Sequence, residues 1–212
     1  KAHTYKYERG GISAYGSIHS TQIPNKDDGT MRLEDIRAAI RGIDDHFPET
    51  KLICLENTHN VCGGAPLSGA YTKEVADIAR TNNIKMHIDG ARIFNAAVAQ
   101  GVDVKELVED ADSMSFCMSK GLAAPVGSVI CGSKDFIDQA RGIRKGLGGG
   151  MRQAGIIAAA GIVALETMVD RLQEDHTNAR LLADGISDLP GVVLDPESIK
   201  TNIIYFEMDD TA

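Results

Sequence analysis

The chain of 212 residues is 43% hydrophobic and 25% charged, a composition typical of a folded protein with one sizeable core and part of a second domain. The net charge of −8 argues against nucleic acid or an anionic membrane as the main partner, although a local basic cluster can still bind a phosphate. The four cysteines form no Cys-x-x-Cys pair, and there is no secretory leader and no apolar run long enough to span a bilayer, which indicates a protein of the cytoplasm or an organellar matrix.

Helical and strand-like stretches alternate along the chain. After a loop that starts at residue 3, helices are predicted over residues 12–16, 30–44, 71–81, 93–99, 104–108 and 134–144. Strands are predicted over residues 51–55, 84–88, 113–118 and 126–131. Helical crossovers join parallel strands, whereas the short turn before residue 126 requires an antiparallel pair. The sequence therefore predicts an α/β fold with a mixed, mostly parallel sheet flanked by helices.

The last quarter of the chain has a different organisation. A long helix is predicted over residues 153–188, with a break near Asp170, and strands follow at residues 191–194 and 202–207. A helix of this length can bridge two domains. We therefore expect a large domain over residues 1–165, and an interdomain helix with the start of a smaller α/β domain over residues 166–212. The missing initiator methionine and the ending just after a strand-like run indicate a fragment.

One lysine follows a buried strand directly. Lys120 lies in a turn between the strands predicted at 113–118 and 126–131, and Asp89 ends an earlier strand, 31 residues before it. That separation equals one helical crossover plus a strand, so two neighbouring strand ends can direct an amine and a carboxylate at one ligand. A lysine held against apolar residues loses its proton easily and can condense with an aldehyde. Taken singly, Lys120 can also be a solvated loop lysine, and Asp89 a helix-capping aspartate.

Four stretches of the sequence resemble one enzyme family. They are Glu56-Asn-Thr-His-Asn60, His87-Ile-Asp-Gly-Ala-Arg-Ile-Phe-Asn-Ala96, Met118-Ser-Lys-Gly-Leu-Ala-Ala-Pro-Val-Gly-Ser128 and Gly148-Gly-Gly-Met-Arg-Gln-Ala-Gly155. In this order they resemble the threonine aldolases of the low-specificity L-threonine type, and the resemblance runs over nearly the whole chain. It implies pyridoxal 5'-phosphate as cofactor and the fold of the aspartate aminotransferases, fold type I. The family's glycine-containing phosphate turn lies ahead of Lys1, so these residues alone would be an incomplete enzyme.

The resemblance assigns roles to individual residues. Lys120 matches the lysine that carries the cofactor as a Schiff base, and Asp89 matches the partner of the cofactor's ring nitrogen. Arg92 matches the arginine that meets the substrate carboxylate, for which a guanidinium is a suitable donor; a surface ion pair is the alternative. His3 matches the histidine that stacks on the cofactor ring.

Further matches lie elsewhere in the chain. His46 matches a histidine placed near the substrate side chain, although a purely structural histidine at a helix end would look the same. His59 is expected to support the pocket from behind. Lys145 and Arg152 flank a triple glycine and resemble residues that reach the cofactor phosphate across a subunit boundary; a solvated basic helix end is the alternative. The resemblance thus implies a homodimer or homotetramer with shared active sites.

The predicted activity is aldol cleavage of L-threonine or L-allo-threonine to glycine and acetaldehyde, with no metal. In this reading His46 or a bound water removes the proton of the β-hydroxyl group. The nearest alternative is a pyridoxal-phosphate-dependent β-eliminating lyase that acts on another amino acid. Two alternatives from other classes are a catalytically silent domain kept for assembly and a metal-binding regulatory domain that uses His46, Cys54, His59 and Cys62, whose spacing fits no common zinc pattern.

Overall fold

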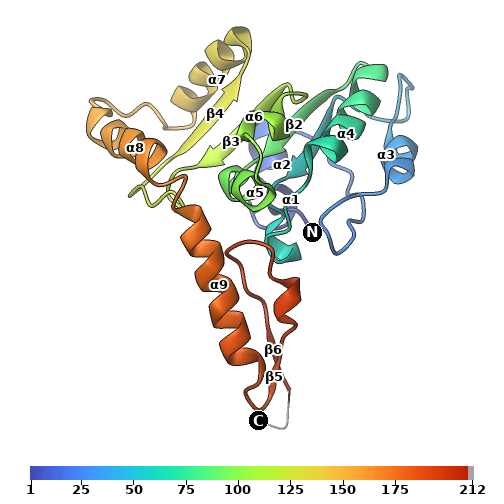
Figure 1. The fold of residues 1–212 in the computed structure, drawn as a ribbon. Helices are drawn as coiled ribbons and strands as arrows, with labels where there is room; N and C mark the ends of the chain where they lie inside the picture. The colour runs from blue at the N-terminus through green and yellow to red at the C-terminus, as the bar shows by residue number, and fades with distance from the viewer. Residues whose placement is uncertain (210–212) are drawn as a thin grey trace.

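A four-stranded sheet forms the centre of the molecule (Figure 1). The computed structural model describes residues 1–209, so the last three residues of the predicted small domain, 210–212, lie outside the described residues. The sheet has the order β1 (Leu52–Glu56), β2 (Lys85–Asp89), β3 (Ser113–Cys117) and β4 (Ser128–Gly132). β1 and β2 pair in parallel, as do β2 and β3, whereas β3 and β4 are antiparallel. The predicted mixed, mostly parallel sheet is therefore confirmed.

Three α-helices connect the parallel strands, as the sequence predicted. They are α4 (Gly69–Thr81) between β1 and β2, and α5 (Ile93–Gln100) and α6 (Val104–Val108) between β2 and β3. Ser68 caps α4 by accepting a hydrogen bond from the backbone N–H of Tyr71. At α6, Asp103 and Glu106 form a capping box. The Asp103 side chain accepts a hydrogen bond from the backbone N–H of Glu106, and the Glu106 side chain accepts one from the backbone N–H of Asp103. These caps fix where each crossover helix begins.

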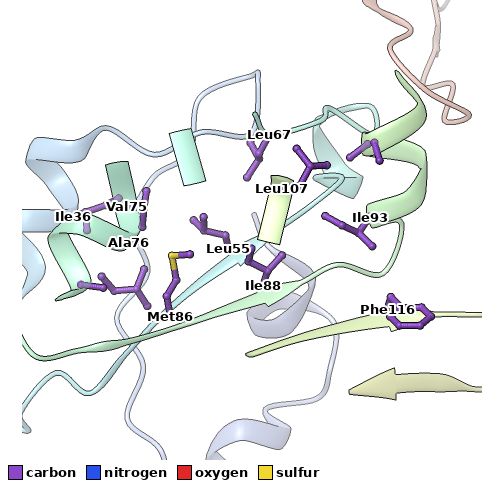
Figure 2. Packing of buried hydrophobic residues seen from close by; sticks show 14 of the residues in the cluster. Ile36, Leu55, Leu67, Val75, Ala76, Met86, Ile88, Ile93, Leu107 and Phe116 are labelled. Carbon is purple, nitrogen blue, oxygen red and sulfur yellow. The ribbon is translucent and has the colours of Figure 1, made fainter. Parts of the chain in front are cut away.

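The hydrophobic core lies between one face of the sheet and these helices (Figure 2). Met86 and Ile88 of β2 are almost completely buried there, as is Val75 of α4. Burying one such side chain stabilises a fold by about 1.5–3 kcal/mol. Because side chains alternate along a strand, the burial of Met86 and Ile88 directs His87 and Asp89 to the opposite face of the sheet.

The N-terminal third contains short helices joined by loops. They are α1 (His3–Lys6), α2 (Gly11–Gly16), α3 (Leu33–Ala39) and η1 (Asn60–Cys62). The expected loop at residue 3 is thus a helical turn. α3 ends well before the predicted residue 44, because the chain leaves the helix at Ile40 and the backbone of Arg41 then hydrogen-bonds Thr50 in both directions.

The C-terminal part consists of helices and a small sheet. α7 (Lys134–Gly146) and α8 (Gly155–Thr167) follow β4, and α9 (Leu172–Ser187) runs beside β5 (Val192–Val193), η2 (Pro196–Ser198) and β6 (Glu207–Met208) (Figure 1). The predicted break near Asp170 is present between α8 and α9. The strand predicted at 202–207 was too long, because Thr201 and Asn202 instead donate hydrogen bonds to Gly64 and Asp175.

Two buried polar contacts join this part to the rest of the chain. The side chains of Asn95 on α5 and His176 on α9 are hydrogen-bonded at 3.1 Å. The hydroxyl of Thr201 donates to the backbone carbonyl of Gly64 at 2.8 Å. The division into domains at residues 165 and 166 stays a prediction. Within residues 1–209, no helix combines the length and apolar character needed to cross a membrane.

Candidate active site

Polar side chains gather at the edge of the sheet where the parallel strands end. Glu56 is the last residue of β1, and it lies directly in register with Asp89, the last residue of β2. Residues in register on parallel strands point to the same face, so both carboxylates lie on the face opposite the hydrophobic core. β3 runs beside β2 and leads to Lys120 at the same edge. Asp89 thus ends one strand, Lys120 follows the neighbouring strand, and both lie at the same edge of the sheet.

Asp89 is a half-buried carboxylate whose protonation is strongly influenced by its surroundings. Its pKa is raised above the ordinary value, first by burial and then by the negative charge of Glu56. A hydrogen bond of 3.2 Å from the backbone N–H of Ala91 and the charge of Lys120 act in the opposite direction. A carboxylate with a raised pKa has a high affinity for a proton or for a cationic N–H donor, as a cofactor ring nitrogen would provide.

Lys120 lies in a tight turn that begins where β3 ends. The backbone N–H of Ala123 donates to the carbonyl of Lys120 at 2.9 Å, and that of Ala124 donates to Met118 at 3.0 Å. A cavity of about 340 Å³ lies between this turn and the start of α9, where Arg171 and Leu172 line it. Lys120 itself is exposed. The expectation that apolar residues surround its amine is therefore wrong for this chain, because the turn places the side chain beyond the core.

Glu56 is one of the most buried charged residues, with 4% of its surface exposed. One carboxylate oxygen accepts a hydrogen bond of 2.6 Å from the backbone N–H of His3. The other accepts a hydrogen bond of 2.9 Å from the backbone N–H of Asn60. Through Glu56, two segments that are more than fifty residues apart in the sequence meet at the end of β1.

His3 binds Glu56 directly, and Arg92 is linked to Glu56 through Asn60. Arg92 precedes the first residue of α5, is partly buried, and donates a hydrogen bond of 3.4 Å to the side-chain oxygen of Asn60. The His3 ring pairs with Glu8 at 2.7 Å and packs against the ring of Tyr7 with centroids 4.8 Å apart. The structure therefore connects His3 and Arg92, both predicted from the sequence, to the same strand end.

His59 is buried behind this edge, with 3% of its surface exposed. Among residues 1–209, its Nδ1 has no hydrogen-bond partner. Burial lowers the pKa of the ring, an effect that the charge of Glu56 partly opposes. A Cβ at Gly29 would lie 2.7 Å from the Cβ of His59, so only glycine allows this close approach. The expected position behind the pocket is consistent with this geometry, and its role stays a prediction.

Three predicted site residues lie apart from this cluster. His46 is 85% exposed, pairs with Asp44 at 3.0 Å, and precedes the N-terminal end of β1, at the opposite edge of the sheet. Lys145, near the end of α7, and Arg152, just before α8, are exposed. Both helices follow β4 in the chain, away from β1 and β2 (Figure 1). The roles predicted for these three residues stay predictions. Among residues 1–209, no group of three or more His, Cys, Asp or Glu side chains could hold a metal ion, so the alternative zinc site is not assembled there.

Sequence reasoning gave no individual role to Glu56 or Asn60. Both belong to the polar stretch after β1, and a polar stretch after a buried strand is a general signal for a site. Their partners could not be read from this signal, because His3 is 53 residues from Glu56 and Arg92 is 32 residues from Asn60.

The amino-acid sequence of this chain is similar to those of known proteins. Residues 1–209 match the family model described as Beta-eliminating lyase. The low-specificity L-threonine aldolase 1 of Arabidopsis thaliana is 50% identical over 98% of this chain and 59% of its own length. The low specificity L-threonine aldolase of Escherichia coli K12 is 44% identical over 99% of this chain and 61% of its own length. The chain thus spans about three fifths of the length of these curated relatives.

A solved structure shows the same fold. It comes from Exiguobacterium sp. 255-15 and is named provisionally as an aromatic amino acid beta-eliminating lyase/threonine aldolase. The superposition has a TM-score of 0.83 at 24% sequence identity, and it covers 98% of this chain and 56% of that one. The chain therefore shares its fold with this solved structure.

Proposed function

Because the chain belongs to the beta-eliminating lyase family, we propose that it forms part of a pyridoxal-phosphate enzyme that cleaves L-threonine or L-allo-threonine to glycine and acetaldehyde. The identity to curated threonine aldolases supports this choice of reaction. The observation that carries the proposal is the placement of Asp89 and Lys120 at one edge of the sheet, at the ends of two neighbouring parallel strands.

The residues at this edge fit the cofactor. Lys120 offers an exposed amine that can hold the cofactor's aldehyde covalently. Asp89 offers a carboxylate whose raised pKa suits a protonated ring nitrogen. When bound, the cofactor supplies an electron sink for the electron pair of the broken Cα–Cβ bond.

The other predicted residues bind and orient the substrate. Arg92 binds the substrate carboxylate through its guanidinium group, and the ring of His3 packs against the cofactor ring. His46 lies at the opposite edge of the sheet in this chain, so a bound water, or His46 of a neighbouring subunit, takes the proton of the β-hydroxyl group as acetaldehyde leaves. The Cα of the remaining amino acid then regains a proton, so glycine and acetaldehyde together account for all the atoms of threonine.

We also propose that the enzyme is a homodimer or homotetramer. Lys145 and Arg152 are exposed and lie away from Asp89 in this chain, so a neighbouring subunit would bring them to the cofactor phosphate. All four cysteines are free, which supports a reducing compartment, the cytoplasm or an organellar matrix.

The description of the family model favours β-elimination as a second candidate reaction. Elimination and aldol cleavage differ in their products, because elimination releases ammonia and a keto acid, whereas aldol cleavage releases glycine and an aldehyde. The same purified protein can be assayed for both sets of products.

The test uses the purified full-length protein with added pyridoxal phosphate. We expect a visible absorption band that changes when threonine is added, together with release of glycine and acetaldehyde. Lys120→Ala should abolish both the band and the cleavage, because the amine that holds the cofactor is gone. Lys105→Ala, at an exposed lysine of α6, is the matched control and should behave like the wild type. Cleavage at the wild-type rate by Lys120→Ala would refute the proposal.

A further inference from the structure

Glu56 is a buried carboxylate, and in the part of the chain that the structure describes its two hydrogen-bond partners are both backbone N–H groups. The backbone N–H of His3 donates to Oε2 at 2.6 Å, and the backbone N–H of Asn60 donates to Oε1 at 2.9 Å, so each oxygen has one donor. Burying a carboxylate is unfavourable unless donors satisfy it, and hydrogen bonds to charged groups are the strong ones. A group of this kind, at the end of a central strand, fixes the position of every segment that binds to it.

Each of its contacts leads to a residue of the proposed site. Its bond to His3 holds the first residue of α1, and therefore the base of the His3 side chain. Its bond to Asn60 holds the residue that accepts a hydrogen bond from Arg92. Its position in register with Asp89 places the two carboxylates side by side.

We propose that Glu56 is the positioning residue of this site, holding His3, Arg92 and Asp89 in one arrangement for cofactor and substrate. This inference rests on the proposed function. Glu56 acts through its neighbours, since both of its oxygens already accept hydrogen bonds from the protein.

The charge of Glu56 has a second effect, on Asp89. Within residues 1–209, four titratable groups interact electrostatically with Asp89: Cys54 and Glu56 on β1, His87 on its own strand, and Lys120 beyond β3. Of these, Glu56 contributes most to the raised pKa of Asp89 after burial, because a like charge disfavours the ionised form. Removing that charge lowers the pKa of Asp89, so Asp89 stays ionised to a lower pH.

Two substitutions separate the two effects. Glu56→Gln keeps the side-chain length but removes the charge and turns one acceptor into an NH₂ group that faces a backbone donor. Glu56→Asp keeps the charge but is one methylene shorter, so it cannot reach both backbone N–H groups. Asp112→Asn is the matched control: Asp112 also accepts a backbone N–H, that of Met86 at 2.9 Å, but it does so at the opposite edge of the same sheet.

The experiment titrates each purified full-length apoenzyme with pyridoxal phosphate across a pH series and follows the visible absorption band. Thermal unfolding of the apo form, and kcat and KM for threonine, are measured on the same preparations. Glu56→Gln should weaken cofactor binding about tenfold or more, the factor expected when one charge-assisted hydrogen bond is lost. In this variant, cofactor binding should be lost at a lower pH than in the wild type, because the pKa of Asp89 is lower without the charge of Glu56. KM should rise, because Arg92 loses its anchored partner.

The Glu56→Asp and Asp112→Asn variants test the positioning role of Glu56 further. Glu56→Asp should bind the cofactor weakly, but it should lose binding at the same acid pH as the wild type because it keeps the charge. It serves as the test variant if Glu56→Gln does not fold. Asp112→Asn should match the wild type in cofactor affinity and in KM. If folded Glu56 variants have the wild-type cofactor affinity, the wild-type pH dependence of binding and the wild-type KM for threonine, the positioning role is refuted while the proposed function stands. If the wild type binds no pyridoxal phosphate, both fail.

Discussion

Two adjacent glycines after β1 allow a sharp test of how the C-terminal part contacts the site. Gly63 and Gly64 both have a left-handed backbone, with φ of +69° and +70°. A Cβ at Gly63 would meet nothing within 4 Å, whereas a Cβ at Gly64 would collide with the hydroxyl of Thr201 and approach Ile203 to 3.2 Å. Thr201 is buried and hydrogen-bonds the carbonyl of Gly64, so it has little room to move.

The two alanine variants should therefore differ in stability. Gly63→Ala carries only the backbone strain of a left-handed residue, about 1–2 kcal/mol. Gly64→Ala carries the same strain plus the cost of forcing an extra group into a packed site, about 1–3 kcal/mol. We expect Gly64→Ala to lower the free energy of unfolding by about 2–5 kcal/mol in total.

The assay is urea unfolding of the purified proteins, followed by far-ultraviolet circular dichroism. The difference between the two variants isolates the contact with Thr201, because the backbone strain is common to both. Equal destabilisation by Gly63→Ala and Gly64→Ala would refute the conclusion that segment 201–203 packs tightly against the loop of the site.

Two further predictions concern α9. Leu172→Ala should lower the free energy of unfolding by about 2–5 kcal/mol in the same urea titration, because Leu172 is 1% exposed. The control Leu181→Ala, at a leucine that is 70% exposed, should lower it by less than about 0.5 kcal/mol. Comparable losses in both variants would contradict the packing of α9. Burial lowers the pKa of His176, so protonation favours the unfolded chain. The stability that neutral His176 provides is complete above about pH 6.5 and is lost as the pH falls below it. His176→Gln should reduce the fall in unfolding temperature between pH 7 and pH 5.5, and His46→Gln, at an exposed histidine, should leave it unchanged; an identical fall in both variants would show that His176 does not contribute.

The sequence predicted the sheet well, because local patterns determine its elements. In β2, buried Met86 and Ile88 alternate with half-buried His87 and Asp89, the period of two expected for a strand with one covered face. α3 shows the opposite case. Its helical pattern continues past Ile40, but hydrogen bonds between Arg41 and Thr50 redirect the backbone, and such contacts between separate segments leave no periodic signal.

The candidate site was predictable where it depends on strand ends. Asp89 and Lys120 could be paired because consecutive strands of a parallel sheet end at the same edge. The contacts of Glu56 were not predictable, since they depend on how the N-terminal segment folds back over the sheet to bring His3 to β1. The exposure of Lys120 depends likewise on the direction of a single turn, which composition and spacing do not specify.

The juxtaposition of Glu56 and Asp89 is itself informative about function. Two carboxylates in register at one strand end repel each other, and a sheet selected for stability alone would place an apolar or oppositely charged residue at one of the positions. Here each carboxylate is retained by backbone N–H donors, from His3 and Asn60 to Glu56 and from Ala91 to Asp89. The repulsion raises the pKa of Asp89 and so increases its affinity for a cationic partner. This local conflict of charges in an otherwise consistent sheet therefore supports the proposal that a positively charged group of the cofactor binds at Asp89.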